Sequence, residues 1–168
     1  MHLTQSEADY LRGIPKACDS TDKIELFQID KPIIIPATSL DGTEKFLVDI
    51  SRCVIILSKW KYQERARRSI PLMRLDINDT DHKNPEIAQD ERTRLQNTFG
   101  WPFERKLGKT HLHIYIEGYG PRWAFPLSIF PKMQEAVESL GEVAYRRLLA
   151  EFLKLCNFQP IPSIITDL

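Results

Sequence analysis

The sequence has no long apolar run, no paired cysteines and no net charge, and each absence narrows what the protein can be. None of its 168 residues belongs to a stretch of about 18 consecutive apolar residues, so we expect no membrane contact and no spanning helix. The N-terminal residues lack the basic start and apolar stretch of a secretory signal, which predicts a cytoplasmic location. Cys18, Cys53 and Cys156 are widely spaced and odd in number, which favours buried reduced thiols over disulfides or thiolate metal ligands.

Motifs that identify common enzyme classes are also missing. The segment GYGP, residues 118–121, has neither the spacing nor the following Lys-Ser/Thr of a phosphate-binding loop. The sequence contains no Gly-x-Ser-x-Gly nucleophile elbow and no His-Glu-x-x-His metal motif. We therefore expect no cofactor and no metal.

Charge is balanced overall but uneven along the chain. The 23 basic and 23 acidic residues cancel, so the whole molecule has no electrostatic attraction to nucleic acid or membrane. Residues 51–75 contain seven basic residues and one acidic residue, whereas residues 76–104 contain three basic and seven acidic residues. A basic block followed by an acidic block predicts a polarised surface or an internal clamp.

Alternating polar and apolar residues predict that most of the chain is β-structure. Extended segments are expected over residues 23–30, 32–40, 45–50, 53–63, 69–78, 111–117 and 122–127. Asp41 and Gly42 give the strongest hairpin turn, and Thr4 with Glu7 forms a capping-box pattern for a short N-terminal helix. One long C-terminal helix is predicted over residues 133–157. Its apolar stripe contains Met133, Val137, Leu140, Ala144, Leu148, Phe152 and Leu155.

These elements predict one α+β domain over residues 1–168. It consists of a mostly antiparallel, curved sheet of six to seven strands, with the C-terminal helix across its apolar side. Residues 79–110 are too long for an ordinary hairpin loop of about two to five residues, so an insertion is predicted at residues 86–109. The middle of residues 79–110, PEIAQDERTRLQNTFG, can form a polar surface helix. The polar side of the sheet is expected to stay at least partly open.

Polar residues on two neighbouring strands form the main candidate site. If the strand that ends near residue 78 pairs with the one that starts at residue 111, one exposed face collects their polar side chains. This face carries Arg74, Asp76, His111, His113 and Tyr115. The two histidines are predicted as acid and base, the tyrosine and aspartate as orienting or assisting groups, and the arginine as the group that stabilises a phosphorane-like charge.

The segment SKWKYQERARR, residues 58–68, interleaves aromatic and basic residues, as a groove for a nucleic-acid backbone requires. The residues predicted to hold phosphates are Lys59, Lys61, Arg65, Arg67, Arg68 and Arg122. Together with the histidine face, they favour a nucleic-acid-binding protein, and specifically a metal-independent endoribonuclease of the bacterial toxin kind with RNA as its partner. A half-exposed sheet whose edge is protected by Lys and Arg explains the same pattern without any function.

Two further hypotheses stay open. A non-catalytic interaction or inhibitor protein, antitoxin-like and carried by a mobile element, would dock a protein partner through Trp60, Tyr119 and Trp123. A metal-dependent hydrolase would use the two histidines of the strand, at positions i and i+2, with Asp76 or His82 as a third ligand.

The chain contains blocks that resemble, in this order, those of a small bacterial family of unknown function: LDGTEKFLVDISR, LSKWKYQERAR, LMRLDIN, HKNP and HLHIYIEGYGPRWAFPL. The resemblance covers about residues 39–127 and is most specific in the last block. It implies an occurrence near prophages, mobile elements and defence or toxin–antitoxin loci, and so favours a nucleic-acid-directed or inhibitory role. The chain departs from this pattern in residues 86–109, which can either cover the polar face or extend it.

Overall fold

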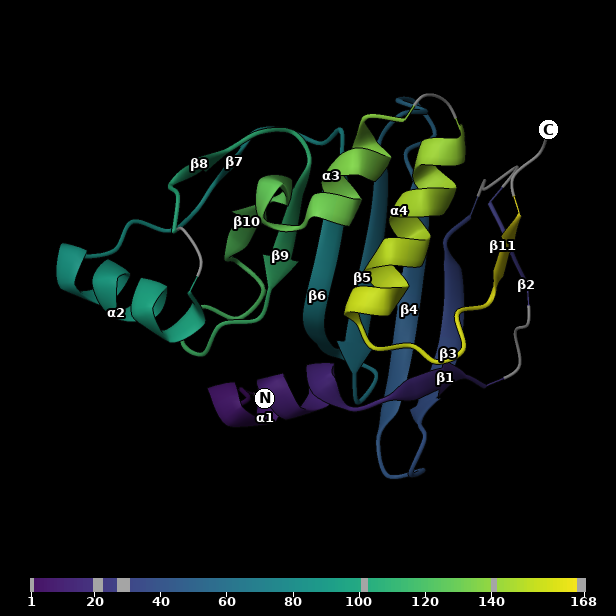
Figure 1. Ribbon diagram of the computed structural model, residues 1–168, viewed down its shortest axis with the longest axis horizontal. Coiled ribbons are helices and arrows are strands. Elements are labelled where there is room, and N and C mark those ends of the chain that lie inside the picture. Colours follow the sequence, from purple (N-terminus) through teal and green to yellow (C-terminus); the bar gives the residue numbers. More distant parts are fainter. Residues whose placement is uncertain (1, 20–22, 27–30, 101–102, 140–141, 166–168) are drawn as a thin grey trace.

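The computed structural model describes residues 2–19, 23–26, 31–100, 103–139 and 142–165 (Figure 1). Its centre is a seven-stranded antiparallel sheet with the strand order β1-β3-β4-β5-β6-β9-β10. The strands are β1 (Lys16–Cys18), β3 (Ile33–Ser39), β4 (Lys45–Arg52), β5 (Trp60–Ala66), β6 (Ile70–Ile77), β9 (His111–Ile114) and β10 (Ala124–Pro126). The predicted α+β class and antiparallel sheet are confirmed.

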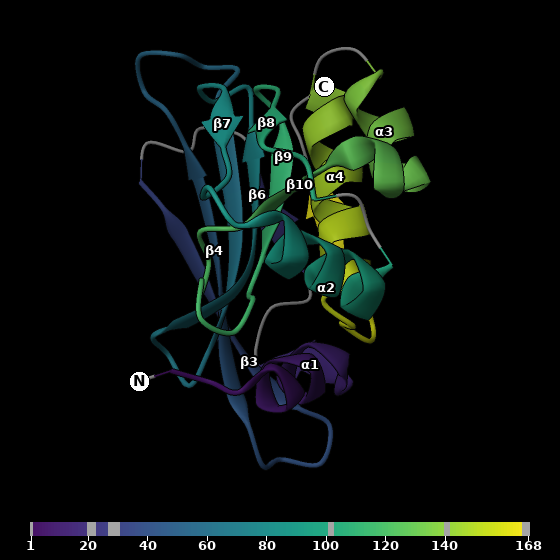
Figure 2. The same ribbon diagram turned by 90° about the vertical axis from the view of Figure 1, so that its left-hand side faces the viewer.

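Helices and two small sheets surround this central sheet. The helices are α1 (Gln5–Gly13), α2 (Gln89–Phe99), α3 (Pro131–Val137) and α4 (Glu142–Leu155), with a 3-10 turn η1 (Leu127–Ile129). The small sheets pair β2 (Lys23–Glu25) with β11 (Ser163–Ile165), and β7 (His82–Lys83) with β8 (Lys106–Leu107). Helices α3 and α4 cover one face of the central sheet, while β7 lies on the side away from them (Figure 2). No described helix is long and apolar enough to cross a membrane.

Local sequence determines the first helix and the first hairpin. Thr4 caps α1, because its side chain accepts the backbone N–H of Glu7 while the Glu7 carboxylate accepts that of Thr4. The β3–β4 turn has Gly42 at a φ of 79°, a left-handed conformation that suits glycine. Asp41 stabilises the turn by accepting hydrogen bonds from Ser39 and Thr43. Both elements were predicted from sequence, and both are confirmed.

Two predicted elements have different limits. The extended segment expected over residues 53–63 becomes a strand only at Trp60, and residues 53–59 form a loop between β4 and β5. The single long helix expected over residues 133–157 is wrong, since two shorter helices, α3 and α4, occupy that stretch. Gly141, a weak helix former, falls between them. Leu140 of the predicted stripe and residues 27–30 of the predicted second strand lie outside the described residues.

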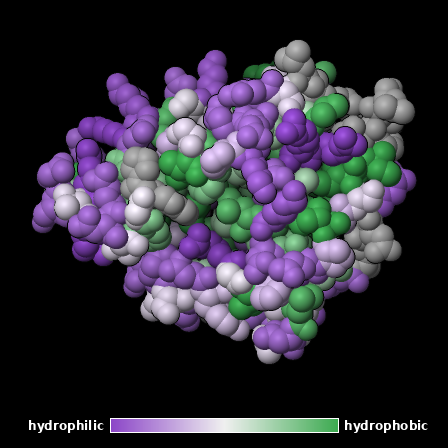
Figure 3. Space-filling model, viewed as in Figure 1, coloured by the Kyte–Doolittle hydropathy of each residue, from purple (hydrophilic) through white to green (hydrophobic). Residues whose placement is uncertain are grey.

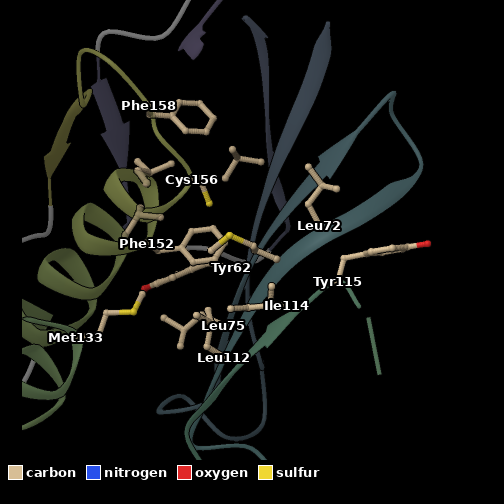
Figure 4. Close-up of a cluster of buried hydrophobic side chains, with 14 of the residues drawn as sticks. Tyr62, Leu72, Leu75, Leu112, Ile114, Tyr115, Met133, Phe152, Cys156 and Phe158 are labelled. Carbon is tan, nitrogen blue, oxygen red and sulfur yellow. The ribbon is translucent and has the colours of Figure 1, made fainter. Parts of the chain in front are cut away.

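The core fills the space between the sheet and the two C-terminal helices. Tyr62, Leu75 and Leu112 project from neighbouring strands towards Met133 and Phe152 of α3 and α4 (Figure 4). The Tyr62 and Phe152 rings lie 6.2 Å apart, within the range of favourable aromatic contact. On the outer surface over these helices, apolar patches alternate with hydrophilic residues (Figure 3).

A fully buried ion pair joins distant parts of the chain inside this core. Lys16 Nζ lies 2.8 Å from Glu64 Oε1, and both side chains are completely shielded from solvent. The same ammonium donates to the carbonyl oxygens of Leu11 and Cys156, at 2.9 and 2.8 Å. Burial raises the pKa of Glu64, although the Lys16 charge opposes this shift. Lys16 therefore ties α1 and β1 to β5 and to the end of α4.

Replacing Lys16 with Met should strongly destabilise the protein, because the Glu64 carboxylate would lose its partner in the core. We expect a decrease in the free energy of unfolding of about 3–5 kcal/mol, measured by urea denaturation. Lys154→Met, which breaks an exposed ion pair with Glu151, serves as the control and should cost at most about 1 kcal/mol. Equal stability of the two variants would contradict this role of Lys16.

Candidate functional site

Strands β6 and β9 bring the predicted polar residues together. They pair antiparallel with Arg74 opposite His113 and Asp76 opposite His111. Because side chains two residues apart on a strand point to the same face, all four lie on the side away from α3 and α4. The predicted pairing of these two strands is confirmed.

The Asp76 carboxylate lies at the centre of this group. Its Oδ2 accepts a hydrogen bond from Arg74 Nε at 3.0 Å, and lies 3.2 Å from His113 Nε2 and 3.6 Å from His111 Nε2. Burial alone would raise the pKa of Asp76. Hydrogen bonding by the two histidines and the Arg74 charge together hold that pKa well below its usual range. Asp76 is therefore ionised at neutral pH although almost no water reaches it.

The expected open face is largely closed. Asp76, His111 and His113 are only 3%, 2% and 1% exposed, whereas the Arg74 side chain keeps 26% of its surface in contact with solvent. The cover comes from β7, whose His82 ring lies 4.9 Å from the His111 ring and 4.7 Å from the His113 ring. Strand β8, from the predicted insertion, pairs with β7 and holds it there. The stretch of residues 79–110, through β7 and its partner β8, thus covers the polar face instead of extending it.

Three imidazole rings consequently form a triangle. The third side, between His111 and His113, measures 5.0 Å between ring centres. One ring nitrogen from each of the three histidines lies within 4.8 Å of those of the others. From the sequence, His82 was named only as an alternative third ligand. Its position in the segment HKNP, residues 82–85, did not show which strand its side chain would contact.

Hydrogen bonds fix the orientation of the two outer rings. His111 Nδ1 lies 2.9 Å from the carbonyl oxygen of Gly108, and His82 Nε2 lies 3.1 Å from Asn84 Oδ1. Asn84 is itself held by Ala124, which donates its N–H to Oδ1 and accepts from Nδ2. Since both partners are oxygen acceptors, each ring donates through the named nitrogen. The His82 ring also interacts with the backbone of Arg122.

The third ring has a similar arrangement. His113 Nε2 faces the Asp76 carboxylate, and Arg74 Nη2 lies 2.8 Å from the same nitrogen. Nδ1 of His113 is buried and has no hydrogen-bond partner among the described residues. The Asp76 carboxylate favours a hydrogen on Nε2, whereas Arg74 Nη2 can only donate and favours a lone pair there. These two contacts therefore do not select one tautomer of His113.

Burial favours the neutral form of His113 and His82. It lowers the pKa of His113 to about 4, although the nearby Asp76 carboxylate acts in the opposite direction. Burial also lowers the pKa of His82, with the His111 ring as a second cause. Neutral imidazole is the form that binds a metal ion, and also the form that acts as a general base.

Tyr115 does not join this group. Its hydroxyl donates to the backbone oxygen of Leu3 at 3.0 Å and accepts the Leu3 N–H at 2.9 Å. Its side chain lies on the far side of the sheet from Phe152, next to Leu72 (Figure 4). Tyr115 shares a face with the histidines as expected, but it anchors the N-terminal segment and does not orient them.

Acidic neighbours neutralise half of the six predicted phosphate-binding residues. The pairs are Lys59 with Asp79, Arg65 with Asp49, and Arg67 with Glu44. Their acidic partners come from β4, the β3–β4 turn and the segment after β6, so counting charge along residues 51–75 did not reveal them.

The other three basic residues have different surroundings. Lys61 lies directly opposite Asp76 on the neighbouring strand and is exposed. Arg68 is exposed in the β5–β6 turn, and neither side chain has an ion pair within the described ranges. The Arg122 guanidinium donates to the Tyr119 carbonyl at 3.0 Å, within its own turn.

The aromatic residues expected to anchor a protein partner are largely structural. Trp60 and Trp123 are buried, so they offer no surface to a partner. Trp60 stacks on Tyr145 at 4.9 Å, and Trp123 packs against Tyr119 at 5.3 Å and Phe103 at 5.0 Å. Phe103 belongs to the segment predicted as an insertion, whose apolar contribution to the core was not anticipated.

The lowered pKa of His113 predicts a stability change in mild acid. The unfolded chain takes up this proton near pH 6.5, whereas the folded chain takes it up only near pH 4. Stability should therefore fall as the pH decreases from about 6.5 to 4, by about 1.4 kcal/mol per pH unit at most. Urea denaturation at a series of pH values, with a chelator present, measures this slope. His113→Gln should flatten it, and an unchanged slope would exclude His113 as its origin.

Comparisons with known proteins add a family but no activity. No curated protein and no solved structure matches this chain. A family model described as a family of unknown function, DUF6978, matches residues 3–152. The match extends well beyond the residues on which the sequence resemblance rests.

Proposed function

Since the chain belongs to DUF6978, a family of unknown function, we propose its function from the geometry of the three histidines: it is a metal-dependent hydrolase. His82, His111 and His113 hold a divalent transition-metal ion, with Asp76 and Arg74 beside it. The triangle of imidazole rings is the observation that carries this proposal.

The dimensions of the triangle fit such an ion. Zinc binds imidazole nitrogen at about 2.0–2.1 Å, so tetrahedral coordination places two ligand nitrogens about 3.3 Å apart. The ligand nitrogens here lie within 4.8 Å of one another, so an ion would draw them together by at most about 1.5 Å. Imidazole ligands suit zinc, copper, iron and nickel, and they disfavour magnesium and calcium.

The surroundings of the rings also fit. Histidines that bind a metal usually donate their other N–H to a carboxylate or carbonyl oxygen, which fixes the ring orientation. His113 has Asp76 and His111 has Gly108 in this position, while Asn84 holds His82.

Three protein ligands leave a coordination position open, which is the arrangement of catalytic zinc sites. An ion bound in this way acts as a Lewis acid and promotes hydrolysis. Arg74 is the partly exposed cation at the centre, placed to contact an anionic or developing negative oxygen of the substrate. Asp76 Oδ1 is buried without a hydrogen-bond partner in the described part of the chain, and it is available to orient a nucleophile.

Metal binding can be measured directly by calorimetry with zinc and by the absorbance of the cobalt-substituted protein. We expect one ion per chain and an increase in melting temperature with metal. His82→Ala should lower the affinity by more than tenfold, and Asp76→Asn by about 10–100-fold. His2→Ala, an exposed histidine outside the triangle, is the matched control. Absence of binding, or equal affinities of His82→Ala and His2→Ala, would refute the metal centre.

RNA cleavage without a metal is the second candidate function. The observation in its favour is that exposed Lys61 and partly exposed Arg74 lie on the same face as Asp76, where they can contact a phosphate. His111 and His113 would then act as acid and base. In this case RNA cleavage persists in excess chelator and is lost in His113→Ala and Arg74→Ala. Cleavage that requires metal supports the hydrolase, and no cleavage by the wild type removes RNA as a substrate.

A further inference from the structure

The loop of residues 53–59 exposes four consecutive aliphatic side chains. Val54, Ile55, Ile56 and Leu57 are 71%, 92%, 52% and 57% exposed. The sequence predicted an extended segment over residues 53–63, but none of the four residues enters the core. A contiguous exposed apolar segment of this kind marks an interaction site more often than a structural one.

Internal hydrogen bonds hold the loop in shape. Cys53 donates its N–H to the Lys59 oxygen, and Lys59 donates its N–H to the Ile56 oxygen, both at 2.9 Å. The Ile56 N–H points to Cys53 Sγ at 3.4 Å. Three N–H groups of the loop thus have partners within it while the four aliphatic side chains face outward, and each such bond lowers the cost of moving the tip out of water.

The base of the loop is fixed to the sheet and to α4. The Ser58 oxygen accepts hydrogen bonds from Asn78 Nδ2 at 3.1 Å and from the Tyr145 hydroxyl at 3.3 Å. Arg52 donates to the Leu57 oxygen at 2.8 Å, and its guanidinium lies 5.2 Å from the centre of the Trp60 ring. The apolar tip therefore projects from a firmly held base.

The residues around the tip are basic. Arg52, Lys59 and Lys61 flank the four aliphatic residues, and residues 50–63 contain no acidic residue. Asp79 pairs with Lys59, which leaves Arg52 and Lys61 as the cations without an ion pair among the described residues. A loop with an apolar tip and basic residues at its foot is complementary to a lipid surface, whose anionic head groups lie over hydrocarbon.

We propose that the 53–59 loop inserts into the surface of an anionic lipid bilayer. All four aliphatic side chains are more than half exposed, so an occupant that buries the tip has to surround all of them. Fluid hydrocarbon surrounds all four, while the basic residues stay at the level of the head groups. This peripheral contact is independent of the metal centre and of the hydrolase function.

Flotation of the full-length protein with vesicles tests this contact. Binding is expected to vesicles of phosphatidylcholine mixed with phosphatidylserine, and it should weaken with salt and on pure phosphatidylcholine. Ile55→Ser should lower the partition coefficient by about tenfold or more. Leu40→Ser is the matched control, because Leu40 is 58% exposed in the β3–β4 turn at the opposite end of β4.

Several outcomes would overturn the proposal. These are no binding to anionic vesicles, equal binding to zwitterionic vesicles, and equal partition of Ile55→Ser and Leu40→Ser. Self-association that Ile55→Ser abolishes, in a protein that does not bind vesicles, would assign the loop to a second copy of the chain. Melting temperatures of both variants verify that they fold, as their exposure leads us to expect.

Discussion

The Asp76 carboxylate keeps its negative charge in a place almost closed to water, and the rest of the site depends on this. An isolated carboxylate there would take up a proton, so Arg74 and the two histidines of β9 have to be close to it. The β6–β9 register supplies this closeness, since it sets Asp76 opposite His111 and Arg74 opposite His113. A shift by one residue would turn these side chains to the apolar face.

Sequence alone predicted the features that depend on local periodicity. The period of two residues along β6 and β9 gave the shared face of Asp76 and His113, and turn and cap residues gave the first hairpin and α1. The position of His82 was not predictable, because it depends on the path of some thirty residues that return over the sheet. The family resemblance held for a group of unknown function, while its bacterial origin and genomic surroundings stay predictions.

Composition alone does not show which groups surround a residue in the fold. The 53–59 loop has the β-branched residues of a strand, yet it lies between two strands and pairs with neither. The basic block looked like a phosphate surface, but cross-strand partners such as Asp49 satisfy Arg65 within the fold. Trp60 and Trp123 looked like exposed anchors, because their burial depends on contacts from distant segments such as Phe103 and Tyr145.

The hydrogen-bond acceptors behind His111 and His82 come from the covering segment itself. Gly108, Asn84 and His82 all lie in residues 79–110. This one segment therefore supplies the His82 ring and also the hydrogen-bond acceptors of the His82 and His111 rings. An ion bound in the triangle would therefore stabilise this segment in its place over the sheet, and a variant that loosens the segment would weaken binding of that ion. Helix α2 belongs to the same segment, so it would contribute to the affinity although it supplies no imidazole.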